Sequence, residues 1–219
     1  MSQTQAAIEH LRVIRSLMEK AHIYRAVSAP AALLGGVLAL GATIWPVVHA
    51  AQTHGDAAFS NATFLIVWHG ILAACTILNV ALLAREAKRR GQSLVSDGMK
   101  MALRAVSPPL IVGGVLAGGL VIWLQNLTLA ALIWVLCYGL ALLATASFSP
   151  KSITRLGWAF VMAGLVLFLA WAANGEVRDL RTDLGPASLV MALTFGLLHI
   201  VYAIAVFVSR PRGEKEAAA

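Results

Sequence analysis

Charged side chains are scarce in this chain, and long stretches contain none at all. Only 12% of the 219 residues are Asp, Glu, Lys or Arg, while 59% are hydrophobic. A soluble domain needs far more polar surface than this composition supplies. The uncharged apolar runs of about 20 residues are long enough to cross a bilayer, so the sequence predicts an all-α, polytopic membrane protein.

Cysteine is equally rare. The two cysteines, Cys75 and Cys137, lie inside apolar runs, which favours packing over a disulfide or a metal pair. The chain contains no His-Glu-x-x-His, no Cys-x-x-Cys and no glycine-rich phosphate loop, and we expect no metal site. The first 25 residues are mixed and charged, without the apolar core of a cleaved signal peptide.

One long apolar segment occurs twice. Arg104 to Trp123 reads RAVSPPLIVGGVLAGGLVIW, and Arg25 to Trp45 reads RAVSAPAALLGGVLALGATIW, with one residue inserted before the Gly-Gly pair. Each copy is long enough to span a membrane. We interpret the chain as a single domain, 1–219, with six transmembrane helices near 27–49, 62–84, 105–124, 128–147, 156–173 and 187–208. All seven prolines are placed at span ends or in connections, because proline is costly inside a helix.

Basic residues flank the predicted spans on one side. Fifteen of the 17 Lys and Arg residues fall in the N-terminal segment, the second and fourth connections and the tail 209–219, and only Arg178 and Arg181 fall on the other side. The positive-inside rule then places both termini in the cytoplasm. Trp45, Trp123 and Trp171 end the odd spans at the opposite interface, where indole rings prefer to lie.

The N-terminal segment, residues 1–25, is predicted to be an amphipathic cytoplasmic helix. Ile8, Leu11 and Ile14 recur at helical spacing opposite Arg12 and Arg15. Such a pattern, here over residues 4–25, is typical of a helix that lies along the membrane surface. The helix either packs on its own protein as a lead-in to the first span or docks a partner.

A shorter pattern recurs in the even spans, where a ring residue is followed by glycine and an aliphatic residue: His69-Gly70-Ile71, Tyr138-Gly139-Leu140 and Phe195-Gly196-Leu197. With the repeated segment, it predicts three helical hairpins of the same polarity. Gly114 and Gly118 form a GxxxG pair, where we expect another helix to pack closely, within one protomer or in a homo-oligomer.

None of the six predicted spans contains Asp, Glu, Lys or Arg. This argues against ion pumps, proton-coupled carriers and intramembrane proteases, because those proteins need ionisable or nucleophilic groups at depth. The remaining polar residues form a candidate buried site: His69, Asn79, Tyr138, His199 and Tyr202. Each histidine is interpreted first as a neutral ring hydrogen-bonded to a neighbouring helix. Ligation of haem or binding of quinone is the alternative, which imidazole supports.

The connection 85–104 is the densest basic cluster. Together with the N-terminal segment it supplies a basic cytoplasmic face: Arg12, Arg15, Arg85, Lys88, Arg89, Arg90, Lys100 and Arg104. Each basic residue near an anionic leaflet contributes about 1 kcal/mol, so we expect this face to contact anionic headgroups. Because the charges flank spans, the pI of 10.0 indicates membrane topology and no nucleic-acid partner.

Three segments carry a family resemblance: LRVIRSLMEK before the first span, YGLALLATASFSPKSITRLG from Tyr138 to Gly157, and GLLHIVYAI around His199. With its LRxIRSLME and LHIVY motifs, the chain resembles an uncharacterised family of bacterial six-span integral membrane proteins. The resemblance implies a bacterial inner-membrane protein and no particular activity. The positions that it singles out are Arg15, Glu19, Tyr138, Arg155, His199 and Tyr202.

Two classes of function are compatible with these features. The first is a non-enzymatic inner-membrane component, without a cofactor, that binds a partner or lipid through its basic face and N-terminal helix. The second is a redox or small-molecule carrier protein that uses a His69/His199 interior to hold b-type haem or quinone. The apolar interior favours the first class. No motif names a substrate, a partner or an oligomeric state.

Overall fold

The computed structural model describes residues 28–53, 60–89, 97–173 and 185–209, with Gln5 and Gly91 as isolated positions. The predicted amphipathic helix over 4–25 lies outside these ranges, as do Arg12, Arg15, Arg90 and the tail 210–219. Within the described ranges the regular structure is helical and contains no strand. The predicted all-α class is therefore confirmed for this part of the chain.

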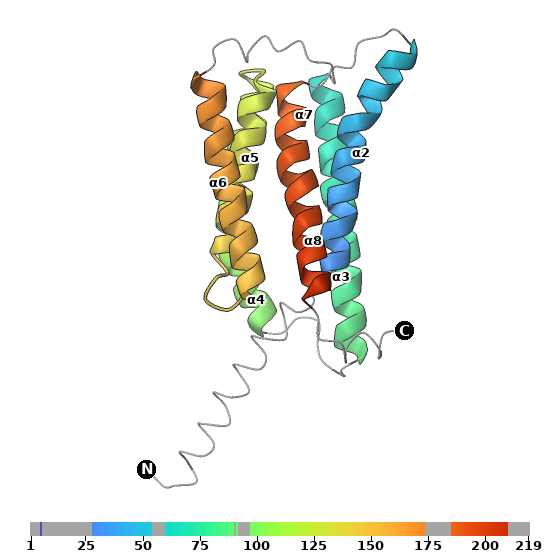
Figure 1. The fold of residues 1–219 in the computed structure, drawn as a ribbon. Coiled ribbons are helices and arrows are strands. Elements are labelled where there is room, and N and C mark those ends of the chain that lie inside the picture. The colour runs from blue at the N-terminus through green and yellow to red at the C-terminus, as the bar shows by residue number, and fades with distance from the viewer. Residues whose placement is uncertain are drawn as a thin grey trace.

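Within these ranges, six helical segments follow one another and stand side by side (Figure 1). Five of them, α2 to α6, are single helices, and the last span is built from α7, the π-helix η2 and α8. Their bounds are α2 Ala29–Thr53, α3 Asn61–Arg89, α4 Asp97–Ile122, α5 Leu127–Leu143, α6 Lys151–Ala173, α7 Pro186–Met191, η2 Ala192–Leu198 and α8 His199–Val208. All but α5 are long and apolar enough to cross a bilayer, and α5, with 17 residues, is only slightly shorter.

Three prolines lie inside helices, so the expectation that all seven mark span ends was wrong for Pro46, Pro108 and Pro109. The reason for the last two is that α4 begins at Asp97, eight residues before the predicted span. A proline leaves the carbonyl four residues earlier without its helical donor. For Pro108 that carbonyl belongs to Arg104, an exposed residue near the basic end of the bundle, where water and headgroups can supply the missing donor.

Helix α5 ends earlier than the predicted fourth span, at Leu143 instead of residue 147. The last turn tightens because both the backbone N–H and the hydroxyl of Thr145 donate to the carbonyl of Leu142, at 3.1 and 2.6 Å. A hydroxyl that satisfies the end of a helix in this way competes with further helical hydrogen bonds. The chain then turns through Ser149 and Pro150 into α6.

The helices form two groups of three. Helix α5 packs between α4 and α6, and α2 packs between α3 and the last span. The groups meet where α7 packs on α5 and where η2 and α8 touch α6. Two of the predicted hairpins, α2–α3 and α4–α5, are thus neighbouring pairs, whereas α6 packs more extensively on α5 than on the last span.

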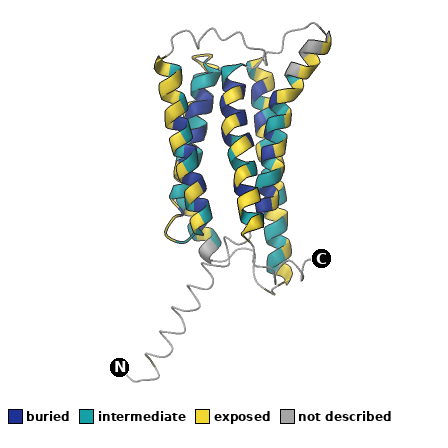
Figure 2. Ribbon diagram, in the orientation of Figure 1, coloured by how far each residue is buried: buried dark blue, intermediate teal, exposed yellow. Residues whose placement is uncertain are grey.

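Side chains of the two groups bury a central core, while large apolar side chains cover the outside (Figure 2). Phe160, Leu132 and Val135 are fully enclosed, whereas Ile66 and Val115 are 73% and 68% exposed. A soluble protein does not expose apolar side chains on this scale, but a bilayer solvates them. The burial pattern therefore supports a membrane-embedded bundle.

The close approach of α4 to α5 is made at Gly113, one residue before the predicted GxxxG pair. A Cβ on Gly113 would lie 2.6 Å from the Cβ of Cys137. A Cβ on Gly114 would meet only Trp134, at 3.7 Å, and one on Gly118 would meet nothing within 4 Å. The expectation that Gly114 and Gly118 pack closely against another helix is therefore not met for Gly118, and Gly114 reaches only the side chain of Trp134 on α5, at an ordinary contact distance.

Candidate functional site

Four rings from four helical elements meet at the junction of the two helix groups. Tyr138 of α5 lies 4.8 Å from Phe160 of α6 and 5.0 Å from Phe195 of η2, measured between ring centroids. Phe160 in turn lies 5.2 Å from His199 of α8. We call Tyr138, Phe160, Phe195 and His199 the aromatic cluster. Edge-to-face ring contacts of this kind add to the stabilisation from burial alone.

The polar atoms of the aromatic cluster are paired with one another. His199 Nδ1 lies 3.0 Å from the carbonyl oxygen of Phe195, and His199 Nε2 lies 3.0 Å from the hydroxyl of Tyr138. A carbonyl can only accept, so Nδ1 carries the hydrogen. Nε2 of the neutral ring then accepts from Tyr138. Both ring nitrogens and the tyrosine hydroxyl are thus satisfied away from water, as a buried polar group requires.

The last span changes its winding beside the cluster. Residues Ala192–Leu198 form a π-helix that carries Phe195 and ends immediately before His199. Short π-helical segments are rare and frequently occur at functional positions. Gly196 within this segment lies against α2, where a Cβ would approach the Cδ2 of Leu40 to 2.7 Å.

The structure does not bring His69 to His199. His69 is exposed on α3, and its Nδ1 bonds to the carbonyl of Leu65 on the same helix at 2.8 Å. The rings that contact His199 are instead those of Tyr138, Phe160 and Phe195. The interior that was expected to contain both histidines therefore contains His199, paired with Tyr138, and not His69.

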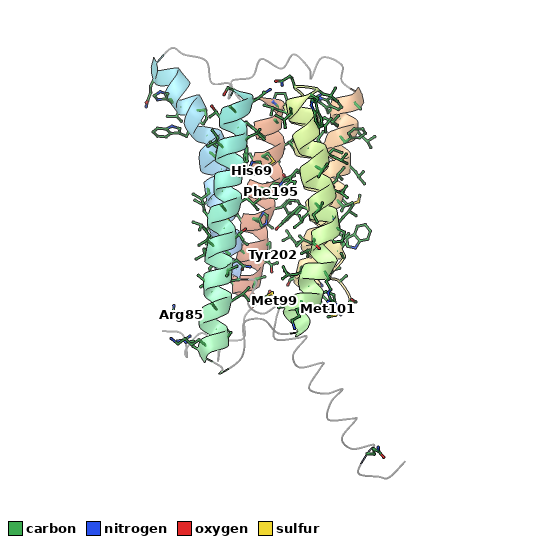
Figure 3. The ribbon with its side chains drawn as sticks, turned by 180° about the vertical axis from the view of Figure 1, so that it is seen from behind. His69, Arg85, Met99, Met101, Phe195 and Tyr202 are labelled. Atoms are coloured by element: carbon green, nitrogen blue, oxygen red, sulfur yellow. The ribbon has the colours of Figure 1, made fainter. Side chains whose placement is uncertain are left out.

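The other two residues of the predicted buried site have separate surroundings. Tyr202 is buried on α8, with its hydroxyl near the side chain of Ser152 at the start of α6. Asn79 on α3 has a buried Oδ1 with no hydrogen-bond partner. Figure 3 shows Phe195 and Tyr202 on the last span between the two helices nearest the viewer, α3 and α4.

Phe160 completes the aromatic cluster and was not predicted as a site residue. No polarity or spacing marks it in the sequence.

The pairing of Tyr138 with His199 had a usable signal, because both even spans start from the same end of the bundle. Counted from Leu127 and Pro186, the two residues lie about 17 and 20 Å along their spans at 1.5 Å per residue.

All basic side chains that the structure describes lie toward one end of the bundle (Figure 3, where Arg85 marks it). They belong to the end of α3 and the starts of α4 and α6, and each is exposed: Arg85, Lys88, Arg89, Lys100, Arg104, Lys151 and Arg155. Trp123 follows the last residue of α4, at the opposite end, and is 80% exposed. The bundle thus has one basic end and one end with exposed tryptophan.

An open hollow adjoins two of these basic residues on α4. It has a volume of about 470 Å³ and is lined by Leu103, Arg104, Val106, Ser107, Leu110 and Ile111. Lys100 lies one helical turn before Arg104, on the same side of the helix. From Arg104 along α4 to Ile111, the lining is apolar apart from the Ser107 hydroxyl. We call Lys100, Arg104 and this hollow the α4 site.

In the described part of the chain, the structure is an α-helical bundle with one basic end and with five helices long and apolar enough to cross a membrane, which is consistent with a multi-pass membrane protein. Comparisons with models of protein families, with curated proteins and with solved structures give no match to the chain. The interpretation of its function therefore depends on the geometry of the aromatic cluster and the α4 site.

Proposed function

We propose that this protein is a non-enzymatic component of the bacterial inner membrane, with both termini in the cytoplasm, and that it binds anionic phospholipid at the α4 site. The observation that carries the proposal is the collection of all described Lys and Arg side chains at one end of the bundle. Positive charge at the ends of spans marks the cytoplasmic side. The anionic headgroups of that leaflet supply the complementary charge.

The α4 site has the two parts that a phospholipid needs. Lys100 and Arg104 offer donors and positive charge to a phosphate, and the Ser107 hydroxyl lies one turn beyond Arg104. The apolar lining then continues along α4 to Ile111, away from the basic end, as an acyl chain would. A water-soluble anion would gain nothing from that apolar stretch, so the site favours a lipid over a free phosphate.

A redox or carrier function at the buried histidines is supported less well. A haem iron needs a free imidazole lone pair, and the available lone pair of His199, on Nε2, accepts from Tyr138. His69 is exposed on another helix. The hydrogen bond between Tyr138 and His199 in the aromatic cluster is better explained as a neutral, satisfied polar pair that fixes how the two helix groups meet.

We expect a Lys100→Gln/Arg104→Gln variant, purified in mild detergent, to retain less phosphatidylglycerol than the parent protein in native mass spectrometry. At about 1 kcal/mol for each charge, apparent affinity should fall about fivefold per residue. Arg155→Gln is the matched control, because Arg155 is exposed at the same end but does not line the hollow.

Two further outcomes bear on this proposal. Retention of phosphatidylcholine should change little in any variant, since its headgroup carries no net charge. Equal retention of phosphatidylglycerol by the parent, the double variant and the control would show that the α4 site is not a lipid site.

A further inference from the structure

Two seams of the bundle are closed by glycines of the even spans. Between the last span and α2, a Cβ on Gly36 would lie 2.9 Å from the carbonyl oxygen of Gly196. Between α5 and α6, a Cβ on Gly139 would lie 3.0 Å from the carbonyl oxygen of Gly157. In each seam, the glycine that follows a ring residue lets two backbones come into contact.

The third glycine of this pattern has no such partner. Gly70 follows His69 on α3, and a Cβ placed on it would meet nothing within 4 Å. Helix α3 packs on α2, and α4 packs on α5, but α3 and α4 share no extended contact. They are the two nearest helices in Figure 3, with the last span visible between them. The seam between α3 and α4 is therefore open.

The repeated segment shows which face of α4 is the counterpart of the covered face of α2. Gly36 and Leu40 of α2 receive Gly196, and the Gly-Gly pairs of the two copies place Gly114 and Gly118 at the corresponding positions of α4. Both glycines are open in this structure: Gly118 has no neighbour within 4 Å of a Cβ, and Gly114 has one at 3.7 Å.

The contacts within the hairpins support this correspondence. The first glycine of each pair would place a Cβ close to a cysteine on the following helix. For Gly35 the neighbour is the Sγ of Cys75, at 3.1 Å, and for Gly113 it is the Cβ of Cys137, at 2.6 Å. The first glycines thus have the same role in both hairpins, and only the second face differs: covered on α2, uncovered on α4.

A hydrogen bond already ties α3 to the end of α4. Asn61 Nδ2, at the start of α3, donates to Gln125 Oε1 in the turn after α4, and Gln125 Nε2 donates to the carbonyl of Ile122 at 3.0 Å. From Asn61, Gly70 lies about 13.5 Å along α3, and from Ile122, Gly114 lies about 12 Å along α4, at 1.5 Å per residue. The two glycines are therefore at matching depth below a common anchor.

We propose that α3 and α4 close on each other, with Gly70 against Gly114 and Gly118, and that the described arrangement is the open form of this seam. Closure swings the two helices about their tied ends and covers the part of the last span that Figure 3 shows between them.

Disulfide trapping in native membranes tests the closure. In a background with Cys75→Ala and Cys137→Ala, we expect Gly70→Cys/Gly114→Cys to form an intramolecular disulfide under mild oxidation, seen as a shifted monomer band and as linked peptides by mass spectrometry. Ile66→Cys/Gly118→Cys, one turn nearer the anchor, should behave in the same way. At each of these four positions the open form has room for the new side chain.

The matched controls are Leu72→Cys/Gly114→Cys and Gly70→Cys/Leu116→Cys. Each moves one cysteine by two residues, to the other side of its helix at nearly the same depth. Both should react much more slowly than the test pairs. Disulfides of dimer size would assign the two faces to neighbouring copies and overturn the proposal, and so would equal rates or no reaction in protein that elutes as a single folded species.

Discussion

Replacing Gly36 by leucine is expected to abolish the accumulation of folded protein. A Cβ at this position would lie 2.6 Å from the Cγ1 of Ile200 and 2.9 Å from the carbonyl oxygen of Gly196. The isoleucine can rotate, but the carbonyl belongs to the backbone of the last span, so α2 and that span must separate. Overpacking costs about 1–3 kcal/mol even where side chains can adjust, and displacing a backbone costs more. The measurement is the monodisperse peak area in size-exclusion chromatography of a fluorescent fusion.

Gly41→Leu is the control for this substitution. It lies on the same helix, about one and a half turns later, where a Cβ would meet nothing within 4 Å. Leucine is also a better helix former than glycine by nearly 1 kcal/mol, so the yield should hold or rise. Equal yields for the two variants would mean that α2 does not pack on the last span as described.

The second large effect concerns the pair Tyr138 and His199. We expect Tyr138→Phe and His199→Leu each to lower the free energy of unfolding by about 1–3 kcal/mol, because each leaves a buried polar atom unpaired. The double variant should cost clearly less than the sum, since neither partner then remains to be satisfied. Thermal unfolding in detergent gives the three values. Additive losses would show that the two side chains do not act as a pair.

The same proteins separate a structural pair from a haem site. The account predicts a colourless protein, even when it is expressed with added haem precursor, and no change of colour in His199→Leu. A stoichiometric Soret band in the parent protein that disappears in His199→Leu would contradict the structural role and favour the redox alternative.

The spans were predictable because bilayer thickness selects apolar runs of about 20 residues. Their ends were less so, because a helix does not stop where the apolar run stops. Helix α3 continues past the predicted 84 to Arg89, and α4 starts eight residues before its predicted span, through Lys100 and Arg104. The prediction that prolines mark span ends was also partly wrong, because proline is tolerated inside a membrane helix wherever the carbonyl four residues earlier finds another partner.

The candidate site was predictable in its residues more than in its grouping. Composition alone singled out Tyr138 and His199 as polar groups in apolar spans. Which of the polar residues meet depends on how the helices are arranged laterally, and no periodicity within a single helix encodes that arrangement. His69 was therefore paired with His199 although it is exposed on α3, and Phe160 was missed because it is one apolar residue among many.

Thiol labelling from the outside tests the central claim, a membrane bundle with its basic end in the cytoplasm, most directly. In the Cys75→Ala/Cys137→Ala background, cysteines at Gln52 or Leu124, both exposed at the end opposite the basic residues, should react with an impermeant maleimide in intact cells. Cysteines at Ser147 or Ser209, exposed toward the basic end, should react only after lysis. Labelling of Ser147→Cys and Ser209→Cys in intact cells, with protection of the other two, would reverse the orientation and contradict the account.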